Sequence, residues 1–283
     1  MSAVLLALSS AFLFGATTVA MRVAFRGGAL AEGGALFTVL TALGVTLPFA
    51  LAQGGPVAGV WPFLLAGLLS PGVSQFLFTF AVREAGASRT SVVIGTAPLF
   101  SVVIAVVVLD EPLEAALAFG AVLIVAGGFL LASEHDRTEH VRLLGLGLAL
   151  TATIVFAARD NFIRWLAVDT DVAPGVAASA TLAAGAAMMA AFVLLGRAPL
   201  RRRDARLFAP AGVLFGLSYV CLFEAYYRGR VSVVSPLVAT ESLWGVALSA
   251  LLIGRSELVG RRLVIAVTLI VAGGVLIGAA NES

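Results

Sequence analysis

Long apolar segments follow one another along the chain, and short polar or glycine-rich stretches separate them. The apolar segments are about 20 residues long, which is the length an α-helix needs to cross the hydrocarbon core of a bilayer. The breaks include Gly54-Gly55-Pro56 and Asp110-Glu111-Pro112, which disfavour continuation of a helix. We therefore predict ten membrane-spanning helices, at residues 3–21, 30–52, 61–82, 89–109, 113–132, 143–166, 173–195, 207–227, 231–253 and 261–280.

The composition supports this interpretation and excludes other classes of protein. The 283 residues are 60% hydrophobic and only 12% charged, whereas about 25% of the residues in a soluble domain are charged. Ten helices of about 22 residues use roughly 220 positions, so a separate soluble enzyme or nucleic-acid-binding domain does not fit. The net charge of +2 does not suggest a polyanionic partner. We expect an all-α integral membrane protein that contacts the lipid bilayer and no nucleic acid.

The two halves of the chain resemble each other. The segment Ile124-Val125-Ala126-Gly127-Gly128 recurs as Ile270-Val271-Ala272-Gly273-Gly274, 146 positions later. Residues 14–22 (FGATTVAMR) match residues 156–164 (FAARDNFIR), and Arg83 matches Arg228, at similar offsets. The unchanged order of these matches predicts an internal repeat.

Five helices per repeat place the second repeat upside down in the membrane, because five is an odd number. We predict a first five-helix repeat at residues 1–132, a polar linker at 133–142 and a second repeat at 143–283. In transporters with inverted repeats, the substrate site lies between the repeats near the middle of the bilayer.

Arginines predict the orientation of the chain. The loops after odd-numbered helices carry fourteen arginines and those after even-numbered helices carry three. Cytoplasmic loops are rich in basic residues, so we expect the odd loops in the cytoplasm and both termini outside the cytoplasmic membrane.

Several short motifs resemble those of EamA-type transporters of the drug/metabolite transporter superfamily. They are Phe14-Gly15 followed by Arg22, Ala81-Val82-Arg83, Pro98, and Asp110-Glu111-Pro112, with a glycine-rich helix ending each half. The chain departs from the family pattern at Glu241-Ser242, where members often have Glu-Pro. The resemblance implies ten helices in two repeats and transport of a small molecule, because family members are mostly exporters of amino acids, metabolites, drugs or nucleotide sugars.

Four charged residues lie more than two positions from either end of a predicted helix: Arg159, Asp160, Glu224 and Glu241. Such groups are costly in a membrane unless they are paired or face water, and they often mark substrate or proton pathways. At 1.5 Å per residue, Glu241 lies about 15 Å into its helix, Asp160 about 9 Å and Glu224 about 5 Å from a helix end on the same side of the membrane. The three carboxylates can therefore line one cavity.

Glu241 is the principal candidate for substrate binding or proton coupling. A carboxyl group in a low-dielectric medium favours its neutral, protonated form, which suits a proton carrier. The alternative is a protonated glutamic acid that joins two helices by a hydrogen bond.

Asp160 has Arg164 four residues later and Arg159 beside it. An ion pair between Asp160 and an arginine either is structural or binds the two ends of a zwitterion or relays a proton. Glu224 has Arg228 four residues later, so an ion pair at the interface is the alternative for Glu224.

The remaining candidates are polar, aromatic or helix-bending residues. Tyr219 and Trp244 are expected to pack against a ligand or to anchor the interface, and Ser74 with Gln75 to form the first-half wall of the cavity or to bond helices together. Pro98 and Pro236 permit kinks in the two corresponding helices, which suits gating.

Taken together, these features predict a secondary active transporter that moves a small metabolite, amino acid or drug-like molecule across the cytoplasmic membrane by alternating access. We expect export, protons as a candidate coupling ion, no cofactor or metal, no enzymatic activity, and a monomer or homodimer. No Walker-type glycine loop is present, so ATP is not expected as the direct energy source. The alternative is an integral-membrane enzyme or scaffold acting on a lipid-like substrate, whose only histidines would be His135 and His140 in the linker.

Overall fold

The computed structural model describes residues 2–108, 115–132, 143–229, 231–253 and 260–280, and every regular element in these ranges is a helix. The linker at 133–142 and the Asp110-Glu111-Pro112 motif lie outside the described residues. The helices are α1 (Ala3–Arg26), α2 (Ala31–Gln53), α3 (Trp61–Gly67), η1 (Leu68–Val73), α4 (Ser74–Ala85), α5 (Ala87–Ile94), α6 (Ala97–Val108), α7 (Ala115–Ala132), α8 (Leu143–Val168), α9 (Pro174–Leu195), α10 (Arg202–Arg228), α11 (Val231–Ala239), α12 (Glu241–Leu252) and α13 (Arg261–Ala280).

Each of the ten predicted segments is helical, but three of them are interrupted. The third segment consists of α3, η1 and α4, the fourth of α5 and α6, and the ninth of α11 and α12. Several helices also extend beyond the predicted apolar core; α1, for example, continues past Arg22 to Arg26. Among the described residues, six helical stretches are long and apolar enough to cross a membrane: α1, α2, the third segment, α8, α9 and α10.

Prolines explain two of the interruptions. A proline clashes with the carbonyl four residues before it and has no N–H to donate. Pro98 stands four residues after Ile94, the last residue of α5, and Pro71 stands four residues after Gly67, the last residue of α3. The predicted kink at Pro98 therefore lies at Gly95-Thr96, just before it.

The interruption of the ninth segment lies at Thr240, between α11 and α12, rather than at Pro236, which lies inside α11. The Thr240 hydroxyl donates to the carbonyl of Leu237 at 2.6 Å, and the Ser242 hydroxyl donates to that of Ala239 at 2.9 Å. Hydroxyls that bond the preceding turn compete with the regular hydrogen bonds of a helix. This local competition accounts for a break directly before Glu241.

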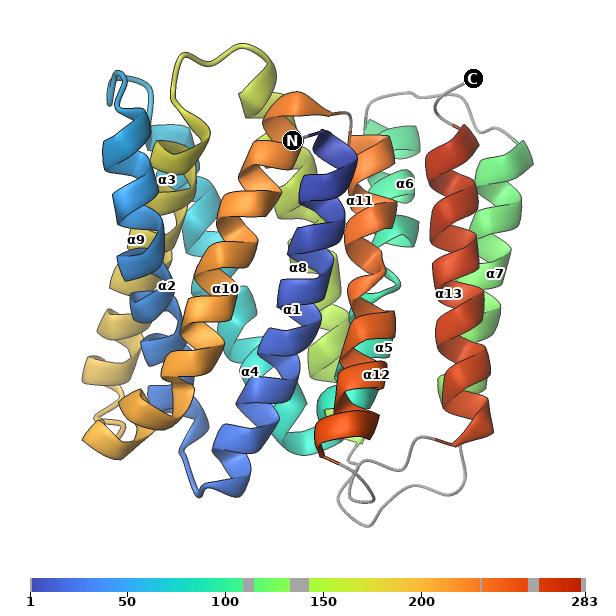
Figure 1. The fold of residues 1–283 in the computed structure, drawn as a ribbon, viewed down its shortest axis with the longest axis horizontal. Helices are drawn as coiled ribbons and strands as arrows, with labels where there is room; N and C mark the ends of the chain where they lie inside the picture. The colour runs from blue at the N-terminus through green and yellow to red at the C-terminus, as the bar shows by residue number, and fades with distance from the viewer. Residues whose placement is uncertain (1, 109–114, 133–142, 230, 254–259, 281–283) are drawn as a thin grey trace.

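The helices lie side by side as a bundle (Figure 1). α7 and α13 form a pair along one edge, whereas α2, α3 and α9 lie together toward the opposite edge. Between them, α1 packs against α10 and α12, and α8 packs against α4, α5 and α6. The first and second halves of the chain are thus intermixed throughout the bundle.

The α7–α13 pair packs reciprocally. A Cβ added to Gly127 would lie 2.7 Å from the carbonyl oxygen of Ala266, and one added to Gly273 would lie 2.5 Å from that of Gly120. Residues 127 and 273, like residues 120 and 266, are 146 positions apart. The glycine of each half therefore packs on the backbone of the other half at the corresponding position.

A second reciprocal contact joins the other side of the bundle. Gly67 of α3 packs directly on the Thr181 carbonyl of α9, and Gly212 of α10 packs on the Thr38 carbonyl of α2. Residue 67 precedes 212 by 145 positions, and residue 38 precedes 181 by 143. The close contacts between helices thus recur at the offset of the sequence repeat.

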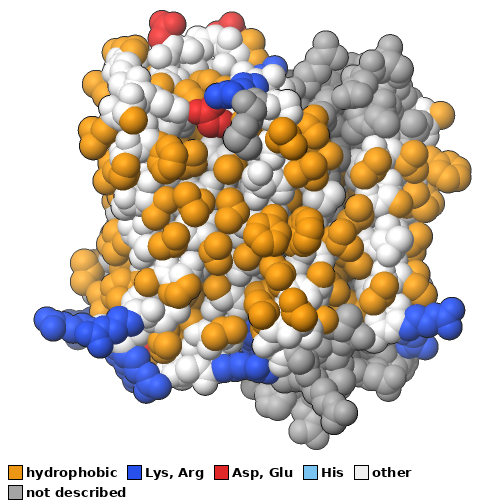
Figure 2. Space-filling model, in the orientation of Figure 1, with side chains coloured by type: hydrophobic (Ala, Val, Ile, Leu, Met, Phe, Trp, Pro, Cys, Tyr) orange, Lys and Arg blue, Asp and Glu red, His pale blue; other side chains and the backbone are white. Residues whose placement is uncertain are grey.

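Charged residues lie mainly at the two ends of the visible surface (Figure 2). Most of the basic side chains gather at one end of the bundle, whereas the acidic side chains lie at the other end beside a smaller basic group, with a broad hydrophobic surface between the ends. The arginine end includes the start of α10, where Arg201, Arg202 and Arg203 follow one another. This distribution is what a bilayer-embedded bundle with one basic end would show.

Candidate functional site

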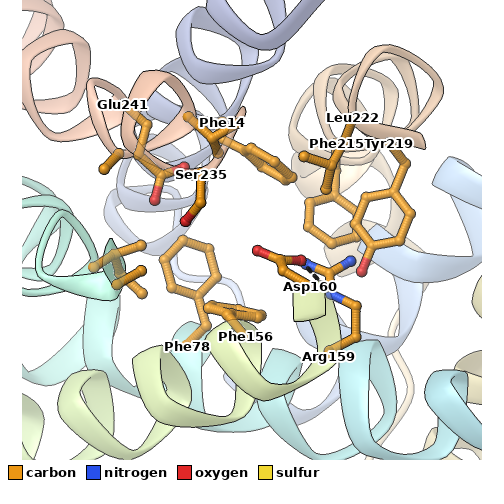
Figure 3. Close-up of a pocket in the computed structure, with 14 residues that line it drawn as sticks. Phe14, Phe78, Phe156, Arg159, Asp160, Phe215, Tyr219, Leu222, Ser235 and Glu241 are labelled. Carbon is orange, nitrogen blue, oxygen red and sulfur yellow. Dashed lines mark ion pairs between the residues drawn. The ribbon is translucent and has the colours of Figure 1, made fainter. Parts of the chain in front are cut away.

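A cavity lies inside the bundle. It is walled by α1, α4, the α5–α6 junction, α8, α10 and the α11–α12 junction. Both halves of the chain contribute. The lining residues, most of them labelled in Figure 3, are Phe14, Phe78, Ile94, Ala97, Phe156, Arg159, Asp160, Phe215, Tyr219, Leu222, Ser235, Val238, Ala239 and Glu241.

Arg159 and Asp160 form an ion pair at the cavity wall. The Arg159 Nε lies 2.8 Å from Asp160 Oδ1, and both side chains are almost completely buried. The Arg159 guanidinium also lies over the ring of Tyr219, 5.1 Å from its centroid, and 5.9 Å from that of Phe156. A buried ion pair needs such additional contacts to offset its desolvation. Asp160 is therefore paired with its neighbour in sequence.

The four-residue spacing suggested an ion pair between Arg164 and Asp160, and a contact that the structure shows for Arg164 is with Tyr226. The Arg164 guanidinium donates to the backbone carbonyl of Tyr226 at 2.7 Å and so ties the end of α8 to the end of α10. The Tyr226 side chain is fully buried and approaches Asp160 from α10. The Arg164 contact holds α8 and α10 together beside the cavity.

Glu241 faces the cavity from the other side (Figure 3). It is the first residue of α12, where a carboxylate interacts favourably with the helix dipole. Within the described part of the chain, no hydrogen bond or ion pair reaches its carboxylate. The charges that act on it are those of Asp160 and Arg159.

Three glycines set the position of α12. A Cβ on Gly15 of α1 would lie 2.7 Å from Trp244 Cβ and 2.9 Å from the Glu241 carbonyl oxygen. Gly245 of α12 packs on the Ser91 side chain of α5, and a Cβ on Gly95 would lie 2.7 Å from the Ser242 Cβ. The absence of side chains at these positions lets α12 approach α1 and α5, which directs Glu241 into the cavity.

Aromatic rings form much of the remaining wall. Phe14 meets Phe215 and Tyr219 with centroid distances of 5.7 and 6.2 Å, and Phe78 meets Phe156 at 6.1 Å. Among these residues the sequence singled out only Tyr219 as a ligand contact. One signal was present: Phe14 and Phe156 hold matching positions in the repeated segment, and both line the cavity.

The cavity brings together Glu241, Asp160, Arg159 and Tyr219 from the predicted set. Trp244 lies outside the lining; it is 37% exposed and packs edge-on against Phe12 at 5.2 Å. The position of Trp244 on the outer face of α12 fits a side chain that anchors the helix at the membrane interface rather than one that contacts a ligand.

Ser74 and Gln75 are fully buried in α4 but do not line the cavity. The Ser74 hydroxyl donates to the Ser70 hydroxyl at 2.8 Å, next to the interruption of the third segment. Pro98 is buried in the first turn of α6, beside the lining residue Ala97. The structure describes Pro236 only as part of the α11 backbone.

Glu224 lies away from the cavity, in a polar cluster at the ends of three helices. Its carboxylate accepts hydrogen bonds from Gln53 Nε2 and Arg228 Nη2, each at 2.5 Å. Gln53 Oε1 in turn accepts from the backbone N–H of Gly175, at 2.7 Å. Gln53 thus links α2, α9 and α10.

We expect Gln53→Leu to lower the free energy of unfolding by about 1–3 kcal/mol, because it leaves the Gly175 N–H and one Glu224 oxygen without a partner. Thermal unfolding of the purified protein measures this loss. Gln53→Glu should be at least as damaging because it places a second carboxylate beside Glu224. Unfolding of Gln53→Leu at the wild-type temperature would show that the cluster adds no stability.

Comparison with known proteins gives the fold and the family. A solved crystal structure, described only as that of a protein, has a TM-score of 0.71 with this chain at 20% identity, and the similarity covers 99% of both chains. A search of curated proteins finds no match. The model of the EamA-like transporter family matches residues 1–133 and 143–279. Because these matches cover nearly the whole chain, the protein belongs to the EamA-like transporter family.

Proposed function

We propose that the protein is a secondary active transporter that moves a small metabolite, amino acid or drug-like molecule across the cytoplasmic membrane by alternating access. In this proposal ten helices cross the membrane as two inverted repeats, residues 1–132 and 143–283, and transport runs outward with protons as the coupling ion. The observation that carries the proposal is the cavity lined by both halves, which contains the acidic or basic side chains of Arg159, Asp160 and Glu241 inside a membrane bundle.

The packing of the helices supports the inverted repeat. The walls of the cavity come from matching helices of the two halves: α1 with α8, α4 with α10, and the α5–α6 junction with the α11–α12 junction. The reciprocal glycine contacts follow the same correspondence. Two similar bodies that meet around a central site can rock against each other, which is the motion that alternating access requires.

Glu241 supports a coupling role for protons. Its carboxylate faces the cavity, and no described residue pairs with it. An ionised carboxylate in such a place must find a proton, a cation or water. In a proton-coupled cycle, Glu241 would take up a proton from one side of the membrane and release it to the other side.

A screen of metabolites and toxins tests the function directly. Cells that produce the protein should retain less of one or more compounds than cells that do not, and purified protein in proteoliposomes should move the same compound when a pH gradient is imposed. If no compound differs between the cells and none is moved in liposomes, the proposed transport activity is wrong.

The predicted orientation can be tested with two single cysteines in a Cys221→Ala background. Val57, in the loop after α2, is 73% exposed, and Leu200, in the loop before α10, is 43% exposed. With the arginine-rich end in the cytoplasm, a membrane-impermeant maleimide should label Val57→Cys in intact cells and Leu200→Cys only after the membrane is opened. The opposite result would place the termini in the cytoplasm.

A further inference from the structure

The charges around the cavity are unequal in number. Among the described lining residues, the carboxylates of Asp160 and Glu241 and the guanidinium of Arg159 are the acidic and basic groups. The positive charge of Arg159 is matched by Asp160 at 2.8 Å. What remains is the unmatched negative charge that Glu241 carries when it is ionised.

The arrangement of these groups also favours a positive ligand. In Figure 3 the Asp160 carboxylate lies on the Glu241 side of the Arg159 guanidinium, which turns toward Tyr219. A ligand between the two walls therefore meets carboxylate oxygens on both sides. An anionic ligand would meet the unmatched negative charge of Glu241 in a medium of low dielectric constant, which is unfavourable.

The aromatic walls define the rest of the ligand. The rings of Phe14, Phe78, Phe156 and Phe215 line the cavity together with Tyr219. Ring faces attract cations and provide apolar surface to bury an organic body. A calcium or magnesium ion instead requires about six oxygen ligands, which the described walls do not supply.

From these observations we propose that the cavity binds organic cations: molecules with one ammonium-type group, held by Glu241, and an aromatic or aliphatic body packed between the phenylalanines. This inference rests on the proposed function, since it names the class of substrate for the same site. Arg159 acts in it as a positioning residue that neutralises Asp160 and leaves Glu241 as the group that selects the charge of the ligand.

Four probes that share a phenyl ring but differ in charge test the proposal. They are phenethylamine (cation), phenylalanine (zwitterion), 3-phenylpropionate (anion) and 2-phenylethanol (neutral), titrated into full-length protein in lipid nanodiscs by calorimetry. We expect phenethylamine to bind at least about tenfold more tightly than the other three. Glu241→Gln should remove this preference. Glu84→Gln, which changes an acid paired with Arg83 at 2.8 Å outside the cavity, should keep it.

Several results would overturn the assignment of organic cations. These are a tighter binding of phenylalanine or phenylpropionate, a preference for phenethylamine that survives in Glu241→Gln, and no binding of any probe. Uptake into proteoliposomes separates this assignment from the proposed function. If phenethylamine binds through Glu241 but no solute is moved, the proposed transport is wrong and the organic-cation site stands. If other solutes are transported but phenethylamine is not the probe that binds most tightly, the organic-cation site is wrong and the proposed transport stands.

Discussion

Glu241→Gln should reduce proton-driven transport in proteoliposomes to the level of protein-free liposomes. The substitution keeps the size of the side chain and its ability to form hydrogen bonds, but glutamine cannot bind and release a proton. Glu241 faces the cavity at the start of α12, and its carboxylate has no partner among the described residues. Its loss should therefore remove the coupling step and leave the packing intact. The measurement is flux of a substrate from the screen under an imposed pH gradient.

The stability of the variant decides how that result is interpreted. Glu241→Gln should elute and unfold like the wild-type protein, because removing an unpaired charge from a membrane bundle costs no ion pair. Glu84→Gln, at a residue outside the described cavity lining, serves as the matched control and should transport normally. Wild-type flux from Glu241→Gln under the same gradient would exclude Glu241 from the coupling role.

Gly67→Ala should produce the largest loss of stability among single-methyl additions to this bundle. Gly67 packs directly on the backbone carbonyl of Thr181, so an added Cβ must push α3 away from α9. A backbone group cannot turn aside as a flexible side chain can. Overpacking of this kind costs about 1–3 kcal/mol or more, and we expect a clearly lower unfolding temperature in detergent.

Two further glycines make the experiment internally controlled. Gly44→Ala adds the same methyl group in α2, where nothing lies within 4 Å, and should unfold at or slightly above the wild-type temperature. Gly212→Ala, at the matching position in the second half, meets Thr41 Cβ at 2.5 Å and should also be destabilising. Equal stability of Gly67→Ala and Gly44→Ala would contradict the close contact.

The interruptions of the three helical segments show how much of the structure can be predicted from local sequence. Pro71 and Pro98 each end a helix four residues earlier, and a proline in an apolar segment is a visible signal. The break at Thr240 has no such signal, because it depends on two hydroxyls that bond the preceding turn. The prediction of a kink at Pro236 therefore named the right helix but not the residue at which it is interrupted.

The acidic residues show a second limit. Glu224 and Glu241 both lie in apolar segments of the second half, and the sequence analysis placed both among the carboxylates that can line one cavity. In the structure Glu224 is bound by Gln53 and Arg228, whereas Glu241 faces the cavity. Gln53 is 171 positions from Glu224, and a contact over that separation is not visible in the spacing of either segment.

The sequence by itself determined that the chain is a helical membrane protein, because the length and hydropathy of its segments leave few other folds. It also showed which few charged residues lie deep inside the apolar segments, and it predicted that the two halves repeat. The tertiary structure alone decided which faces of those helices meet. In a bilayer, residues that face lipid and residues that face the protein core are both apolar, so the rotation of a helix is set by contacts such as those of Gly15 and Gly67. Those contacts place Glu241, Asp160 and five aromatic rings around one cavity.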